Sequence, residues 1–164
     1  MSKFQRLIQK INKINKMKSI FNKTDNQEII ARINLLAPES KALWGKMSVD
    51  QMLNHCNDAV LVAFNEKELS IPLIWKILAP MMKNMILKKP QFDKNSPTAK
   101  EFKYDTNFDF ETIKNELITN FSRFQSGFEA ISCKKHPFWG YMTADEWNNL
   151  HWKHIDHHLR QFGV

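Results

Sequence analysis

The sequence predicts an all-α protein whose architecture is a four-helix bundle. Its 164 residues include only four Gly and six Pro but 12 Phe, eight Met and five Trp, a balance that favours long helices over a turn-rich β-sandwich or barrel. Several segments place apolar side chains at three- and four-residue steps, which gathers them on one face of a helix. Two of these segments begin with a capping box, the Ser/Thr-x-x-Glu/Gln pattern that opens helices. The length is that of one domain.

The first expected helix of this domain covers about residues 26–36 and stops before Pro38. The second is marked by a capping box between Ser48 and Gln51, and its apolar periodicity extends to about Glu66. Both segments therefore predict amphipathic helices with one buried side.

Residues 71–88 are rich in Ile, Leu, Met and Trp, with Pro72 near the start and Pro80 inside. Because proline interrupts the hydrogen bonds of a helix, we expect one kinked or broken helix, packed on several sides, with its Met residues as core filler. Residues 89–110 are expected to form a long connection with a short strand or turn. Long connections of this kind often act as a lid or a crossover.

The fourth long helix follows this connection and is expected over residues 113–128, on its regular apolar spacing. The last helix opens with a second capping box, Thr143 and Glu146, and extends to about Gly163. Four substantial helices with one or two long connections predict a four-helix bundle.

A basic amphipathic extension, residues 1–16, is expected to precede the bundle domain at residues 17–164. Residues 1–24 contain seven Lys or Arg and no acidic residue, so they carry the whole net charge of +7, and the rest of the chain is balanced. Three interpretations stay open for this arm: packing on the domain or a partner, attachment to a membrane surface, or contact with nucleic acid. Packing is favoured, since Ile-rich stripes at helical spacing are usually packing surfaces. Met17 is an alternative start.

The cysteines and the location of the charge limit the compartment and the partners. Cys56 and Cys133 lie far apart without a Cys-x-x-Cys spacing, and no stretch has the pattern of a signal peptide or of a ~20-residue membrane span. We therefore expect a cytoplasmic protein with no membrane span. No nucleic-acid partner is expected, because the basic charge belongs to the arm and not to the domain surface.

Histidines carry the main functional signal, since four of the six fall within eight residues: His151, His154, His157 and His158. Residues four apart on a helix project from the same face, so His154 and His158 can reach one cation together. His157 is displaced by about 100° from His158 and is expected to point elsewhere. A third ligand must come from another segment, and His55 is the natural candidate because it lies in the middle of the second helix.

Each histidine has a plain alternative as a surface residue or a hydrogen-bonded core residue, and spacing by itself leaves both interpretations open. No His-Glu-x-x-His sequence is present, so nothing indicates a metalloprotease. Asp156 and Arg160 are candidates for an outer acceptor and an anion clamp, or for solvated surface groups.

The sequence indicates general bases, nucleophiles and pocket-lining residues less specifically than it indicates the histidines. Asp50, Asp58 and Glu146 are candidate general bases if the bundle turns them inward. Cys56 is expected to be a small core residue and not a nucleophile. The Trp residues are expected to belong to the core, with the walls of an apolar pocket as the alternative.

Three motifs carry a resemblance to a known family. They are Leu43-Trp44-Gly45-Lys46-Met47 with Gln51-Met52-Leu53-x-His55, His136-Pro137-Phe138-Trp139-Gly140 with Met142-Thr143-x-x-Glu146-Trp147, and a final segment from Lys153 through His154, His157 and His158 to Gly163. From about residue 17 to the end, the sequence resembles the DinB/YfiT-like superfamily of metal-dependent four-helix-bundle proteins. Within it, the chain is similar to a bacterial branch known mainly as a domain of unknown function.

The resemblance implies a site and a chemistry. The superfamily pattern has one His on the second bundle helix and a His-x-x-x-His pair on the last, followed by Gln, which corresponds to His55, His154, His158 and Gln161. It implies a divalent ion, zinc or nickel, held by the three imidazoles. It further implies a metal-dependent hydrolase or thiol S-transferase that acts on a small-molecule substrate, such as a low-molecular-weight thiol, and a homodimer. Leu159-Arg160 departs from the Arg-Gly of other branches, which bears on the substrate and not on the metal ligands.

A non-enzymatic bundle is the alternative function. In that hypothesis the apolar interior or a groove binds a small molecule or a partner protein, and the histidines form a polar network. Imidazole nitrogens much farther apart than the roughly 3 to 3.5 Å of a shared ion would favour it. A third hypothesis attaches the bundle to anionic lipid or nucleic acid through residues 1–24.

Overall fold

The computed structural model describes residues 18–96, 98 and 100–164. Within these residues the secondary structure is helical and contains no strand, with one isolated bridge between His136 and Gly140. The all-α class is therefore confirmed. No helix in this part of the chain is both long and apolar enough to cross a membrane. The extension expected over residues 1–16 lies outside the described residues.

Helices α2 (Lys23–Asn34) and α3 (Val49–Ala63) both begin at capping side chains. The Asn22 side chain accepts hydrogen bonds from the first turn of α2, which starts that helix three residues earlier than predicted. The predicted capping box between Ser48 and Gln51 is present at the start of α3. α3 ends before Glu66 because Asn65 adopts a left-handed conformation, with φ of 57°, that a helix cannot continue.

Helices α5 (Phe110–Ser122) and α6 (Ala144–Gln161) complete the set that encloses the core. α5 begins at the Asp109 cap and ends before the predicted residue 128, where the chain tightens into the 3-10 turns η2 (Arg123–Ser126) and η3 (Phe128–Ala130). α6 opens with the predicted capping box of Thr143 and Glu146. Both capping boxes were therefore correct markers of where a helix starts.

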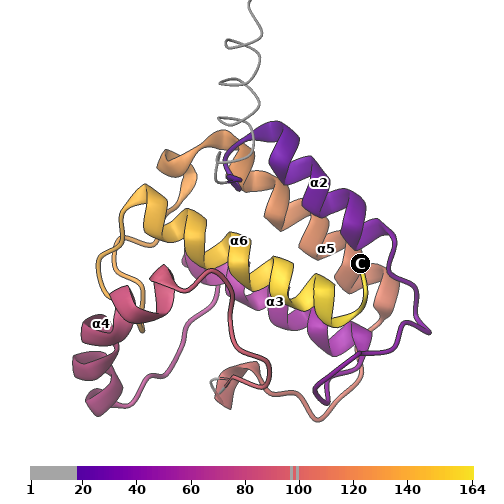
Figure 1. The fold of residues 1–164 in the computed structure, drawn as a ribbon, viewed down its shortest axis with the longest axis horizontal. Coiled ribbons are helices and arrows are strands. Elements are labelled where there is room, and N and C mark those ends of the chain that lie inside the picture. The colour runs from indigo at the N-terminus through magenta and orange to yellow at the C-terminus, as the bar shows by residue number, and fades with distance from the viewer. Residues whose placement is uncertain (1–17, 97, 99) are drawn as a thin grey trace, which may run out of the picture.

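Four helices, α2, α3, α5 and α6, pack around one core, and their arrangement is visible in Figure 1. α5 lies against α3 and α2, and α6 lies against the same two helices. The largest fully buried side chains include Trp147, Phe121, Phe124, Met52, Leu53, Leu117 and Leu159. Each such side chain contributes about 1.5–3 kcal/mol by leaving water. The core therefore fixes α6 against α3, the two helices that carry the candidate ligands.

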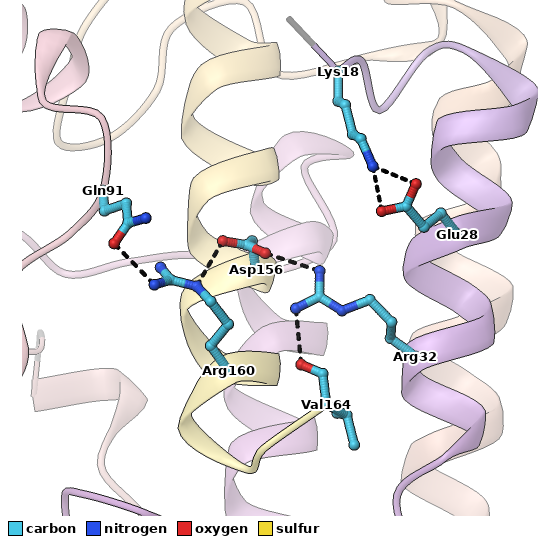
Figure 2. Close-up of polar contacts among 7 residues, drawn as sticks. All are labelled: Lys18, Glu28, Arg32, Gln91, Asp156, Arg160 and Val164. Carbon is cyan, nitrogen blue, oxygen red and sulfur yellow. Dashed lines mark hydrogen bonds and ion pairs between the residues drawn. The ribbon is translucent and has the colours of Figure 1, made fainter. Parts of the chain in front are cut away.

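Ion pairs and hydrogen bonds on the outer side of α6 connect it to α2 and to the long connection at Gln91, as Figure 2 shows. The Arg32 guanidinium of α2 donates to Asp156 at 2.8 Å and to the carbonyl of Val164 at 2.9 Å. Arg160 donates to Asp156 at 2.9 Å and to Gln91 at 2.9 Å. Asp156 is two residues from His154, about 200° around the helix. Asp156 and Arg160 therefore belong to an ion-pair network, which leaves Asp156 no role as an acceptor for the ligand histidines.

Helix α4 (Leu73–Lys88) contains Pro80 and is not broken there, so of the expected kinked or broken helix the break is excluded. The expectation of packing on several sides was wrong, since only Ala79 and Leu87 of α4 are buried, so its methionines are surface residues and not core filler. The physical reason is that the other four helices already close the core. α4 contacts the molecule along one edge, against α6 and the loop at Phe138 and Gly140.

The predicted long connection covers residues 89–109 and includes the 3-10 turn η1 (Lys100–Phe102). It forms a crossover over α3 and α6. The Phe102 ring lies edge-on to His55, with ring centroids 5.3 Å apart, and Phe92 lies edge-on to His157 at 6.4 Å. The Tyr104 hydroxyl donates a 2.7 Å hydrogen bond to Asp58 of α3. The connection therefore covers the side of the bundle on which the histidines gather.

Candidate metal centre

The three histidines predicted as ligands come together in the structure. His55 projects from the middle of α3, and His154 and His158 project from successive turns of α6. One ring nitrogen of each lies within 4.8 Å of the other two. His55 Nε2 and His154 Nε2 are 2.8 Å apart. The structure thus contains a group of three imidazoles that could bind a metal ion.

The apolar residues of α6 explain why its histidines face α3. Ile155 and Leu159 are also four residues apart and are buried in the core. They lie one position after His154 and His158, so packing of the apolar pair turns the two imidazoles to the edge of the core, toward His55. The local sequence and the α3–α6 packing together produce the convergence.

Burial keeps these imidazoles neutral at physiological pH. His55 and His158 are buried, whereas His154 retains partial access to solvent. Loss of water around the charged form lowers the pKa of His55 to about 4 and that of His158 to about 3, and the neighbouring imidazoles add to the decrease for His158. The same two causes hold the pKa of His154 well below its usual range. Neutral imidazole is the form that binds a metal ion.

Gln161 orients the ring of His158. Its side-chain oxygen lies 2.8 Å from His158 Nδ1, and its amide nitrogen donates to the carbonyl of Trp44 at 2.7 Å. Because that donation fixes the amide orientation, Nδ1 of His158 carries the proton and Nε2 keeps a free lone pair. Gly45 permits the approach, since a Cβ there would lie 2.5 Å from the Gln161 amide nitrogen and its φ is +83°.

Replacement of Gln161 by leucine is expected to weaken zinc binding by about 10- to 100-fold, because the His158 ring loses the acceptor that fixes its proton and its orientation. Competition with a chromophoric chelator measures this affinity. Gln161→Glu keeps an oxygen acceptor for Nδ1 but loses the donor to the Trp44 carbonyl, so it is expected to weaken zinc binding less than the leucine variant does. A leucine variant with unchanged zinc affinity would contradict the positioning role.

The donor set fits a divalent ion. Bonds of about 2.1 Å to a tetrahedral ion place neighbouring nitrogens about 3.4 Å apart. The separations here extend from 2.8 Å to at most 4.8 Å and so bracket that value. No hydrogen-bond partner of His55 Nδ1 is found in the described part of the chain. Three imidazoles around an ion leave a fourth coordination position open.

The other three histidines are not in this group. His157 lies edge-on to Trp44, with centroids 5.7 Å apart, so it points away from the shared point as predicted. His151 stacks on Trp147 at 5.5 Å in the core. His136 Nδ1 accepts hydrogen bonds from the main-chain N–H groups of the two residues after Pro137 and stabilises that turn. These three histidines have structural roles.

The candidate general bases all hold other partners. Asp50 accepts from the N–H of Phe108 at 2.8 Å. Asp58 accepts from the Tyr104 hydroxyl at 2.7 Å and pairs with Lys67 at 2.8 Å. Glu146 serves the capping box of α6 and pairs with Lys83 at 2.8 Å. None of them is directed at the three imidazoles.

Cys56 is a core residue, as expected. It is 1% exposed, its sulfur contacts that of Met52 at 3.7 Å, and burial raises the pKa of its thiol. Trp147 also belongs to the core. The main-chain carbonyl of Trp44 accepts a hydrogen bond from Gln161, which connects Trp44 to the site.

Sequence reasoning missed the residues that cover the site. Phe102, whose ring lies against His55, and Phe92, whose ring lies against the neighbouring His157, come from the long connection, which has no apolar periodicity and resembles no motif. The sequence signal closest to them is the concentration of aromatic residues in an otherwise polar loop, and it does not say which face of the bundle they cover.

Fold and site together define an all-helical protein with a candidate three-histidine metal centre. The chain belongs to the family described as Protein of unknown function (DUF1569), whose model matches residues 14–163. The match starts inside the segment expected to precede the domain and covers all three histidines of the site. No curated protein and no solved structure matches the chain.

Proposed function

We propose that this protein is a DinB/YfiT-like four-helix bundle that binds zinc or nickel through His55, His154 and His158. Its proposed activity is that of a metal-dependent hydrolase or thiol S-transferase on a small molecule. The observation that carries the proposal is the convergence of three neutral imidazoles from two helices on one point. The packing of α2, α3, α5 and α6 around one core supports the bundle.

The surroundings of the three imidazoles favour one class of reaction. A divalent ion bound by three neutral ligands keeps its full charge and lowers the pKa of water or a thiol in the open position. Phe102 shields the His55 side of the site, and the partial exposure of His154 provides the side from which a small molecule reaches it. The three candidate general bases, Asp50, Asp58 and Glu146, hold other partners in the described structure. Thiol transfer is therefore favoured over hydrolysis, since a thiol, with a pKa of about 8.5, loses its proton far more readily than water.

Elemental analysis of the full chain tests the proposal. The protein is produced without a polyhistidine tag, which would supply its own ligands, and is purified at neutral pH without chelator. We expect about one equivalent of zinc or nickel per chain. After chelator treatment, zinc added at about 1,000 times its Kd is expected to stabilise the folded state by about 4 kcal/mol, measured as a higher Tm. A chain that neither carries a divalent ion nor responds to one would overturn the proposal and favour the polar-network hypothesis.

A further inference from the structure

Helix α4 presents its apolar residues to solvent. Eight large apolar side chains are exposed: Leu73, Ile74, Trp75, Ile77, Leu78, Met81, Met82 and Met85. At 100° per residue they occupy one arc of about 200°, opposite the buried Ala79 and Leu87. We call these eight residues the α4 apolar face. A helix of a globular protein normally turns such a face to the core, and a large exposed apolar patch marks an interaction site.

The charged residues of α4 are all lysines, and at 100° per residue Lys88 lies within the arc of the α4 apolar face, whereas Lys76 and Lys83 lie on the opposite side of the helix. Between Glu68 and Asp93 the ionisable residues are all lysines, Lys76, Lys83, Lys88 and Lys89. Lys83 is paired with Glu146 and also donates to the carbonyl of Tyr141 at 2.7 Å. Lys76 and Lys88 are exposed and make no ion pair with the described residues.

The adjoining loop extends this basic surface. Tyr141 is 74% exposed, and the Lys135 ammonium lies over its ring at 5.7 Å. Phe138 of the same loop stacks on Trp75, with ring centroids 6.3 Å apart. The α4 apolar face is therefore continuous with an aromatic and lysine-rich loop.

The positive charge of the α4 lysines favours one kind of partner for the α4 apolar face over the others. A second copy that used the same face would bring together two Lys88 side chains and two helices whose charged residues are all lysines. The basic arm of residues 1–24 would likewise add positive charge to this face within one chain. An anionic partner meets no such repulsion. A helix with an apolar face, Trp at its edge and Lys beside it is typical of segments that lie in the interface of a bilayer. We propose that the α4 apolar face docks the protein on membranes that contain anionic phospholipid, without crossing them.

Co-sedimentation with lipid vesicles tests this proposal on the full chain. The vesicles contain phosphatidylcholine with about 30 mol% phosphatidylserine, and vesicles of phosphatidylcholine alone provide the uncharged comparison. The variant is Met81→Gln, since the Met81 side chain is 77% exposed and its replacement does not disturb the core. The matched control is Leu35→Gln, because Leu35 is 70% exposed but lies at the end of α2.

We expect the unmodified chain to bind the anionic vesicles and to bind the neutral ones much more weakly. Met81→Gln is expected to lower the partition coefficient about tenfold, and Leu35→Gln to leave it unchanged. The proposal is overturned if the unmodified chain does not sediment with anionic vesicles, or if the two variants bind equally. It is also overturned if sedimentation velocity shows that Met81→Gln dissociates a dimer while vesicle binding is unaffected, since the occupant is then a second copy.

Discussion

Replacement of His154 by glutamine is expected to weaken zinc binding by the full chain about 100-fold or more while the protein stays folded. A structural zinc site gains about 10–16 kcal/mol from four ligands, or roughly 3 kcal/mol from each, and 1.4 kcal/mol is a tenfold change in affinity. Of the three imidazoles, His154 is the one with partial access to solvent, so a polar replacement of similar size costs little stability there. Chelator competition measures the affinity, and circular dichroism confirms the helical content.

The matched control for this experiment is His157→Gln. His157 lies on the same helix next to His158, but its ring lies edge-on to Trp44 and outside the ligand group. Its replacement is expected to leave zinc affinity essentially unchanged. If His154→Gln binds zinc as tightly as the unmodified protein, or if His157→Gln loses as much affinity, the assignment of the ligands is wrong.

The metal-free protein is expected to unfold in mild acid, between about pH 6 and pH 4. Burial lowers the pKa of His55 and His136 to about 4 and that of His151 and His158 to about 3. In the unfolded chain the pKa of these histidines returns to about 6.5. Below that pH the unfolded state binds more protons than the folded state, so the free energy of unfolding decreases as the pH falls. Each histidine lowers the free energy of unfolding by up to about 1.4 kcal/mol per pH unit, and the four together lower it by roughly 5 kcal/mol per pH unit. A typical domain has a total stability of about 5–15 kcal/mol.

Circular dichroism at 222 nm of chelator-treated protein, from about pH 8 to pH 3.5, measures this transition. The informative variant is His151→Phe, because the His151 ring stacks on Trp147 and contacts Phe124, and its Nε2 has no partner in the described part of the chain. With one buried histidine fewer, the midpoint is expected to move to lower pH. A chain that stays fully helical at pH 4 would show that buried neutral histidines do not control its acid stability.

Elements set by neighbouring residues were predictable from the sequence. The starts of α3 and α6 follow from the capping boxes at Ser48 and Thr143, where side chains within three residues satisfy the first N–H groups of the helix. The ends were less predictable. α5 stops at Ser122 although its apolar spacing continues to Phe128, because the chain changes to 3-10 turns around Gly127. Phe124 lies in these turns and is fully buried, so apolar spacing continues past the end of the helix.

The convergence of the three histidines was predictable because helical geometry places His154 and His158 on one face, and the superfamily pattern that the sequence resembles adds His55. The environment that orients the ligands was not predictable. The main-chain carbonyl of Trp44 holds Gln161, and Phe102 covers His55, through contacts between residues 117 and 47 positions apart in the chain. Contacts of this kind leave no periodic signal in the sequence.

The amino-acid sequence alone determined that residues 71–88 are an apolar helical segment and that His154 and His158 share one face of a helix, since both are properties of a few turns of chain. Only the tertiary structure decided which apolar helix is buried. α2, α3, α5 and α6 enclose the core among themselves, so α4 remains outside with its apolar face in solvent. The physical reason is that burial is a property of the surfaces that pack together. The hydrophobicity of a side chain sets the free energy that its burial would gain, but it does not determine which surface packs against it.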